Sequence, residues 1–557
     1  MKKKLLTLVL LSLAGMASIA AAPVERIYIT TDRDVYLAGD AVWCSLTCLG
    51  GNGLFSNESA VSYLELVSEE GTACTAKIGL LEGRGAGSFR IPVTTPTGTY
   101  RLIAYTAVNA AENGEPWLPG SKLLTIFNST SKARVPGAVE IMEEADYQQQ
   151  NPETTEPQGR LELSTRVRLQ KGQSAILNLH NPGTDASVSL SIFHEDGLLP
   201  AGREHTPESF LNSIPASVSL KREVSVERDG EIISTRVRGT VLKGDDVSFA
   251  TLSAAGSPTD LYIGRSVGDE SIRFYTSNIY GDREIVCEVS QLDRQEGYID
   301  FESPFIYPDT GTLPKLRLSR AQRADLTARK ASLRAEKELR IDTLTTFIRH
   351  REDLLLASIP FRRYHLDDYN RFPSVKEVIV EIVREINLKT EKGKPILLLT
   401  YSDALGRKFE RSDNILVMMD GVALSDLSLL MNFDAMLLED IDIYDEPFVC
   451  GRVPFHGLVN FITKKNYVTA LHFPANVRVV DFQGIAYPVA YSGTVPPGNT
   501  QDLRQLLYWH PILELEAGSD YRLEFTSPGY AGRFKAVAEG FTKDGTPVYQ
   551  EFTFEVE

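Results

Sequence analysis

The stretch that decides the fold of the central part of the chain is ILVMMDGVALSDLSLLMNFDAMLLEDIDIYDEPFVCGRVPFHGLVNFITKK, residues 415–465. An apolar run ends at Asp420-Gly421, a dipeptide that strongly favours a tight turn between two strands. Apolar residues alternate with other residues around Ile441–Ile443 and again from Gly457 to Lys464, as they do in strands that bury one face. The stretch therefore predicts several short strands and a tight hairpin.

A helix is predicted just before these strands. Ser374 stands in the position of an N-cap, and Glu377 follows three residues later as its capping-box partner. Apolar residues recur at helical spacing from Val375 to Ile386, so one side of the helix is suited to packing against a sheet. Helix and strands together predict a small α/β module over residues 361–467.

The sequence of this module resembles the plug domain of TonB-dependent receptors. In that family an apolar strand ends in Asp-Gly, an acidic segment leads into an Ile-rich strand, and a Gly precedes a closing strand of the form G-x-I-N-I-x-T-K. The residues that carry the resemblance are Leu416–Met418, Asp420-Gly421, Glu439–Ile443, Gly451 and Gly457–Lys464. The residues after Lys465 are too few for the barrel of such a receptor, whose roughly twenty or more strands each need about 9–11 residues. The resemblance implies a plug-like domain without a barrel.

The N-terminus has the pattern of a secretory signal peptide. Three lysines follow Met1, an apolar segment runs from Leu5 to Leu13, and small residues continue to Ala22. We expect residues 1–21 to be removed and the mature protein to be periplasmic or associated with the outer membrane, with an extracellular location as an alternative. No later apolar run reaches the roughly 18 residues of a membrane span, so no transmembrane segment is expected in the mature chain.

Composition narrows the possible partners. The 557 residues carry a formal net charge of −16, and 43% of them are hydrophobic. Because no dense stripe of Lys or Arg occurs, a general nucleic-acid surface is not expected. The length fits about three to five folded domains.

The cysteines leave two interpretations open. Five is an odd number for an oxidising compartment, so at least one thiol stays free or pairs between chains. Cys44 and Cys48 share one face of a predicted strand about 13 Å apart, too far to bridge, so Cys74 is the better partner if either forms a disulfide. Alternatively, these cysteines are small buried hydrophobic residues. The five cysteines of the sequence are Cys44, Cys48, Cys74, Cys287 and Cys450.

The first folded segment is predicted to be a β-sandwich, because short alternating runs follow one another between turn residues. The expected strands are 26–31, 41–47, 62–67, 73–78, 87–93, 98–106 and 122–127. The sequence of Ile27–Trp43, Gly87–Pro92 and Gly98–Leu102 resembles that of the macroglobulin-type domain of the alpha-2-macroglobulin family. The resemblance implies such a domain over residues 22–130. The glycines from Gly83 to Gly87 precede a strand, so they are interpreted as a turn and not as a phosphate-binding loop.

The rest of the chain is divided by composition. Residues 131–157 are polar and contain prolines, which is typical of a linker. The run 319–357 lacks Gly and Pro and predicts one long helix or two, with either a solvated charged face or a role as a spacer packed across the neighbouring domains. The remaining assignments are a second sandwich-like segment at 158–229, a carboxypeptidase-regulatory-like β-sandwich at 230–310, a helical connector at 311–360 and a C-terminal sandwich-like segment at 468–557. The predicted fold class is thus a multidomain, mainly β protein of macroglobulin- or immunoglobulin-like sandwiches with a helical connector and a small α/β plug-like domain.

No enzymatic motif is present in the sequence. The eight histidines are scattered, and neither H-E-x-x-H nor G-x-S-x-G occurs. The C-G-E-Q sequence of a reactive thioester is absent as well, so covalent trapping of proteases is not supported. We therefore predict no catalytic, cofactor-binding or metal-binding residues.

Chains of this mixed design resemble exported proteins of Bacteroidetes-type bacteria. We expect a non-enzymatic envelope protein with a binding or scaffold role, whose plug-like module docks on a protein partner. The alternatives are a thioester-independent protease inhibitor of macroglobulin type and a glycan-binding surface protein. Because loops held on a rigid scaffold often carry binding, docking is expected at the turn and the loop that follow the module's strands. The candidate residues are Asp420, Gly421, Asp445, Glu446, Phe448, Arg452 and Phe455.

Overall fold

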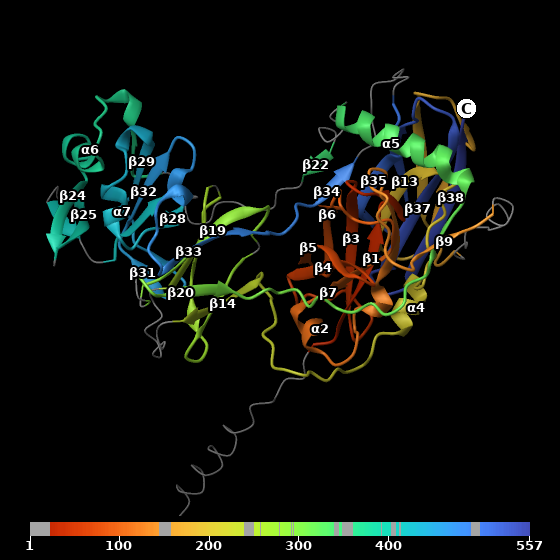
Figure 1. Cartoon of the computed structure of the whole chain (residues 1–557), viewed down its shortest axis with the longest axis horizontal. Coiled ribbons are helices and arrows are strands. Elements are labelled where there is room, and N and C mark those ends of the chain that lie inside the picture. Colours follow the sequence, from red (N-terminus) through yellow and green to blue (C-terminus); the bar gives the residue numbers. More distant parts are fainter. Residues whose placement is uncertain are drawn as a thin grey trace, which may run out of the picture.

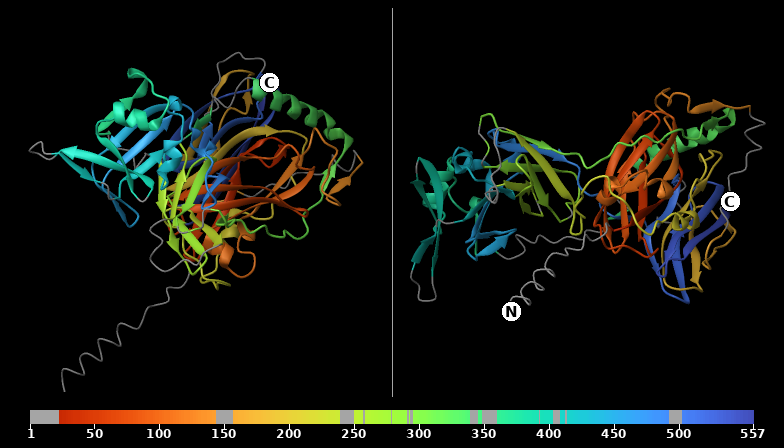
Figure 2. Two further views of the ribbon diagram at one scale, coloured as in Figure 1. Left: turned by 60° about the vertical axis from the view of Figure 1, so that its left-hand side comes forward. Right: turned by 90° about the horizontal axis from the view of Figure 1, so that it is seen from below.

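The described residues form three β-sandwiches and one α/β module, grouped in two lobes (Figure 1). One lobe holds the first and second sandwiches, and the other holds the third sandwich and the module. Seen from below, the order along the molecule is module, third sandwich, first sandwich and second sandwich (Figure 2, right). This computed structural model describes residues 23–143, 157–238, 250–338, 345–347, 360–491 and 502–557, except 257, 278, 291, 293, 294, 392, 403–407, 412 and 413. The predicted signal peptide lies outside the described residues. The fold class is mainly β, as predicted.

The first sandwich is one eight-stranded sheet of order β1-β3-β6-β5-β4-β7-β8-β2 that folds over its own core. The fold occurs within β5, whose first part pairs with β4 and whose last two residues, Leu80 and Leu81, pair with β6. Gly83 forms the predicted turn before β6, with φ of 73°. Gly85 and Gly87, which were assigned to the same turn, lie within β6 and pair with β3. The elements are β1 (Glu25–Thr31), β2 (Val35–Leu37), β3 (Ala41–Gly50), β4 (Val61–Ser68), β5 (Gly71–Leu81), β6 (Arg84–Arg90), β7 (Gly98–Tyr105), α2 (Ala107–Ala111) and β8 (Lys122–Phe127).

The second sandwich is built from two distant parts of the chain. Strand β12 pairs antiparallel with β36, and β13 lies between β35 and β37, so residues 158–195 and 502–557 share one core. The assignment of 158–229 and 468–557 to separate units is therefore wrong. The elements are β10 (Glu162–Ser164), β11 (Arg168–Leu169), β12 (Ser174–Asn181), β13 (Ala186–Glu195), β22 (Thr345–Phe347), β34 (Val489–Tyr491), β35 (Leu506–Leu515), β36 (Ser519–Thr526), β37 (Gly532–Thr542) and β38 (Pro547–Val556).

The third sandwich consists of two four-stranded sheets, β17-β18-β14-β20 and β16-β15-β19-β33. Its strand β33 comes from beyond the α/β module, so the sandwich extends outside the predicted range of 230–310. The elements are β14 (Ile232–Arg238), β15 (Ala250–Ala254), β16 (Asp260–Ile263), β17 (Arg265–Ser266), β18 (Ser271–Tyr275), β19 (Arg283–Val289), β20 (Tyr298–Phe301) and β33 (Val477–Phe482).

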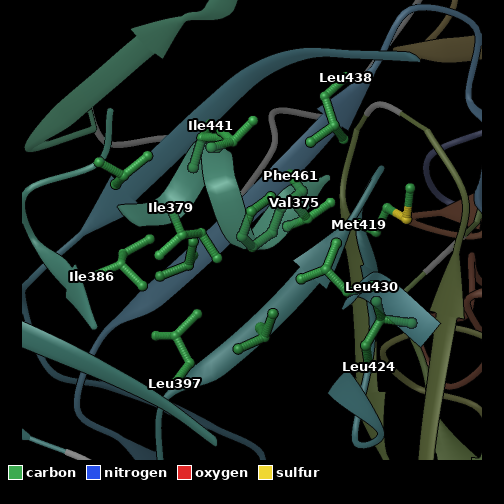
Figure 3. Packing of buried hydrophobic residues seen from close by; sticks show 14 of the residues in the cluster. Val375, Ile379, Ile386, Leu397, Met419, Leu424, Leu430, Leu438, Ile441 and Phe461 are labelled. Atoms are coloured by element: carbon green, nitrogen blue, oxygen red, sulfur yellow. The ribbon is translucent and has the colours of Figure 1, made fainter. Parts of the chain in front are cut away.

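The α/β module has a five-stranded sheet of order β23-β29-β32-β27-β28. Helix α6 begins at the predicted capping box of Ser374 and Glu377 and buries Val375 and Ile379 near Phe461 of the sheet (Figure 3). The elements are β23 (Arg362–His365), α6 (Val375–Glu381), β24 (Ile386–Glu391), β25 (Lys394–Ser402), β26 (Lys408–Arg411), β27 (Leu416–Met419), β28 (Val422–Ala423), α7 (Leu427–Met431), β29 (Leu438–Tyr444), β30 (Phe448–Cys450), β31 (Val453–Phe455) and β32 (Leu458–Thr463).

The described parts of the connecting segments are less helical than predicted. Part of the expected linker 131–157 forms β9 (Val139–Ile141), which pairs with β21 (Leu316–Leu318). Within the expected helical run, only α5 (Arg323–Glu338) is a long helix among the described residues, and β22 is a strand. Helix α5 packs on the first two sandwiches, and Arg329 on this helix binds Asp196 at 2.5 Å. The packing of α5 on two sandwiches agrees with the interpretation of this helix as a spacer between domains. The short helix α4 (Pro207–Asn212) lies on the chain from the second to the third sandwich.

Candidate functional site

The predicted Asp-Gly turn is present, but it is not a binding loop. Asp420 and Gly421 join β27 to β28 with φ of 49° and 82°, the two positive values that a tight hairpin turn requires. The Asp420 carboxylate is buried and accepts hydrogen bonds from the backbone N–H and the hydroxyl of Thr463, both at 2.7 Å. Its acceptor positions are thus already used within the module.

This turn is also a joint between the module and the third sandwich. The backbone N–H of Gly256 donates to the carbonyl oxygen of Asp420 at 2.9 Å. A Cβ atom on Gly421 would lie 3.0 Å from the carbonyl oxygen of Gly256, so only glycine fits without displacement. The expectation that Asp420 and Gly421 are exposed docking residues is wrong, because packing of the third sandwich covers the turn.

Of the other five candidate residues, Phe448, Arg452 and Phe455 lie on the hairpin of β30 and β31, and Asp445 and Glu446 lie in the segment that leads into it from β29. The inner side of the hairpin carries Phe448 and Phe455, which are paired across the strands and stacked with ring centroids 5.3 Å apart. Both rings belong to a cluster with Leu261 of β16, and the thiol of Cys450 donates to the carbonyl oxygen of Leu261 at 3.5 Å. These contacts fix the hairpin to the third sandwich. The two phenylalanines therefore hold the hairpin in place and are only half-buried.

The outer side of the hairpin faces solvent. Val449 is 68% exposed and pairs across the hairpin with the exposed Pro454. The charged residues Glu446 and Arg452 are exposed on either side, whereas Asp445 is half-buried. Within the described part of the chain, neither Glu446 nor Arg452 forms an ion pair. The outer side thus presents a small exposed apolar patch flanked by the charged side chains of Glu446 and Arg452. We call Glu446, Val449, Arg452 and Pro454 the hairpin tip.

A larger hollow lies between the first and second sandwiches. Its cavity volume is about 1110 Å³, and its walls come from the β5–β6 turn, the loop around Phe55 and strand β35. Leu81 is 71% exposed at this cleft, and Arg84 pairs with Glu514 across it. Sequence reasoning did not find the cleft, because its walls come from segments far apart in the chain and no local pattern marks them.

One histidine on the cleft wall has an unsatisfied atom. Nδ1 of His510 is buried and has no hydrogen-bond partner among the described residues. Burial lowers the pKa of His510, so its imidazole is neutral at physiological pH. A neutral ring offers one donor and one acceptor to a bound polar group.

The described residues contain neither a cluster suited to a metal ion nor a disulfide. No group of three or more His, Cys, Asp or Glu side chains is placed to hold a metal ion in the described ranges. All five cysteines are free thiols, so neither of the two disulfides considered for Cys44 or Cys48 is formed. Burial raises the pKa of Cys74 to about 12 and that of Cys450 to about 11. Such thiols stay protonated and are poor nucleophiles.

No protein-family model matches the sequence, and no curated protein matches it. Among solved structures, the chain is similar to Salmonella alpha-2-macroglobulin reacted with methylamine, with 10% identity, a TM-score of 0.24, and coverage of 97% of this chain and 40% of that one. Trypsin-activated alpha-2-macroglobulin from Escherichia coli gives 9% identity, a TM-score of 0.23 and coverage of 97% and 42%. The adhesin InvE of Yersinia pseudotuberculosis gives 12% identity and a TM-score of 0.14, and the match covers 50% of this chain and 56% of that one.

The chain spans about two fifths of the length of these macroglobulins. At such low identities and TM-scores, the likenesses establish neither a shared arrangement of domains nor a shared activity. The resemblance of the module to a receptor plug stays a prediction. In the described part of the chain, no helix has both the length and the apolar character needed to cross a membrane.

Proposed function

We propose that the protein is a non-enzymatic scaffold of the bacterial envelope that docks on a protein partner through the hairpin tip of its α/β module. The observation that carries the proposal is the division of the hairpin into two faces. The inner face is fixed by the stacked Phe448 and Phe455, and the outer face leaves Val449 and Pro454 in solvent. An exposed apolar pair on a rigidly held loop is a feature of recognition sites.

The charges support a protein partner. Glu446 and Arg452 flank the apolar pair without an ion-pair partner among the described residues. An apolar centre with a charged rim is the usual composition of a protein–protein interface. The rim charges would orient the partner, and the apolar centre would supply most of the affinity.

The proposal is tested by site-specific crosslinking in the native envelope. A photo-crosslinking amino acid is placed at Val449 of the full-length precursor and, in a matched control, at Val380 on α6. Val380 is 67% exposed on the same module, so both probes have equal access to solvent. We expect one reproducible protein adduct from position 449 that is absent from position 380.

A second variant separates docking from chance proximity. Pro454→Glu places a charge in the apolar pair opposite Val449 and leaves the inner phenylalanines intact. The adduct from position 449 should then disappear while the fold, followed by circular dichroism, is retained. Equal adducts from both probe positions, or an adduct that survives Pro454→Glu, would contradict docking at the hairpin tip.

A further inference from the structure

The outer face of one sheet of the third sandwich is rich in arginine and tyrosine. In the sheet β17-β18-β14-β20, alternate residues point away from the core, as the burial pattern of β14 and β18 shows. The strands β14 and β20 of this sheet lie at the lower edge of the left lobe in Figure 1. We call this surface the arginine face. Its members are Arg238, Arg265, Arg273, Tyr275 and Tyr298, and Arg236 lies beside them, paired with Glu302.

Two of these arginines form an uncompensated pair. Arg265 of β17 lies directly opposite Arg273 of β18, and like charges in such cross-strand positions destabilise a sheet. Within the described residues, neither arginine forms an ion pair with a carboxylate. Arg236 differs, because its Nε donates to Glu302 at 2.7 Å. The Arg265–Arg273 pair is therefore suited to hold an external anion between its guanidinium groups.

The tyrosines position two of the arginines. The Arg265 guanidinium lies 5.2 Å from the ring centroid of Tyr275, and that of Arg238 lies 6.0 Å from the ring centroid of Tyr298. The rings are 45% and 46% exposed, so these contacts occur at the surface. Stacking on a ring restricts a guanidinium while leaving its N–H edges available for bidentate bonds to a carboxylate. Less conformational entropy is then lost when the anion binds.

We propose that the arginine face binds an acidic polysaccharide. From strand geometry, Arg273 and Arg238 are about 14 Å apart along the sheet, a distance that a few linked sugar units span. Carboxylates on separate sugars would bind at the Arg265–Arg273 pair and at Arg238. The hydroxyls between them would meet the side chains of Ser234 and Ser271, which share this face because they pair with Arg273 and Arg236.

The same surface is less suited to nucleic acid. Asp300 lies opposite Arg236, and Glu302 follows on the same edge, which adds local repulsion to closely spaced phosphates. Sugar hydroxyls, by contrast, donate hydrogen bonds to such carboxylates. Single-stranded nucleic acid also needs free aromatic faces for base stacking, and arginines are stacked on both tyrosines.

The test is affinity electrophoresis of the full-length mature protein in gels that contain polygalacturonate, alginate or hyaluronate, with dextran as the neutral polymer. We expect at least one acidic polymer, but not dextran, to retard the protein. The double variant Arg265→Gln/Arg273→Gln should bind this polymer about tenfold more weakly or worse, because two charge-assisted contacts are lost. The matched control is Arg236→Gln, which removes an arginine that is already paired and should change the affinity by less than about twofold.

Several outcomes would overturn the proposal. These are retardation by none of the three acidic polymers, an equal loss in Arg236→Gln, or unchanged binding by the double variant. Single-stranded DNA that retards the protein as strongly as the acidic polymers would assign the face to polyanions in general. Thermal unfolding of the double variant serves as the folding control. Because a like-charge pair is removed, its midpoint should not fall. This inference is independent of the hairpin tip, since it concerns a different surface and a different ligand.

Discussion

The junction between the two lobes contains a buried carboxyl group whose ionisation should loosen the molecule at high pH. Glu227 lies on the segment that leads from the lobe of the first and second sandwiches into β14 of the third sandwich, and it is buried beside Tyr63. The Tyr63 hydroxyl donates to its two oxygens at 2.8 and 3.0 Å, and the backbone N–H of Ile232 donates at 2.8 Å. Nearby, Nζ of Lys77 forms an ion pair with Oε1 of Glu231 at 2.7 Å, and both side chains are buried.

Desolvation dominates the behaviour of this carboxyl group. The pKa of Glu227 is raised to about 8, mainly by burial and also by the neighbouring Glu231 carboxylate. The hydrogen bonds from Ile232 and Tyr63 and the charge of Lys77 offset part of this rise. The folded state therefore binds this proton more tightly than the unfolded chain does. The associated stability is fully present below the ordinary glutamate pKa and is lost as the pH rises through about 8. Complete ionisation costs about 5 kcal/mol.

Glu227→Gln should abolish most of this pH dependence, because the amide keeps the size and an acceptor oxygen but cannot ionise. We expect the wild-type protein to lose thermal stability between about pH 4.5, the ordinary glutamate pKa, and about pH 8. At about 2–4 °C per kcal/mol for a unit of this size, the loss is on the order of 10 °C. The variant should match the wild type at the lower pH and exceed it at the higher pH. Differential scanning calorimetry at both pH values measures the effect.

The control is Glu70→Gln, which changes an exposed glutamate in the turn between β4 and β5 and should leave the pH profile unchanged. A fall in midpoint as large in Glu227→Gln as in the wild type would refute the reasoning, because the pH dependence would then arise elsewhere.

Three further perturbations should have local and separable effects. Lys77→Met leaves the buried Glu231 carboxylate without its cation, which should cost about 3–5 kcal/mol in chemical denaturation, and an unchanged midpoint would argue against a buried ion pair. Asp420→Ala removes the acceptor for the Thr463 N–H. It should destabilise the module by about 1–3 kcal/mol, seen as faster hydrogen exchange in β32 while the sandwiches are unaffected. Deletion of residues 502–557 should make β12 and β13 sensitive to limited proteolysis, because both lose their pairing strands; continued resistance would contradict the shared sandwich.

The elements that the sequence predicted well are those with short-range causes. The strands of the first sandwich follow from alternation over a few residues, and the start of α6 follows from the Ser374–Glu377 capping box. The turn at Asp420-Gly421 follows from two residues that tolerate positive φ. Each of these signals lies within about ten residues, so each can be interpreted without knowing what packs on it.

What the sequence did not predict depends on contacts between distant residues. Leu177 pairs with Leu523 in the second sandwich, and nothing in the alternation of either strand identifies the other. The same limit applies to the candidate site. The turn at Asp420 was predicted correctly, but its burial depends on Gly256 in another unit. The cleft near His510 likewise exists only once the two sandwiches are in contact.

The path of the chain between the lobes explains why a scaffold role suits this fold. One segment supplies β33 to the third sandwich and then β34 to the second. Between these strands, the side chain of Gln483 donates to the carbonyl oxygen of Thr75 at 2.7 Å, and the backbone N–H of Ala486 donates to that of Lys77 at 2.8 Å. The lobes can therefore separate only if this segment is pulled from β5. The hairpin tip and the arginine face are thus held at fixed positions relative to the first two sandwiches, so that a partner bound at one surface is oriented with respect to the whole molecule.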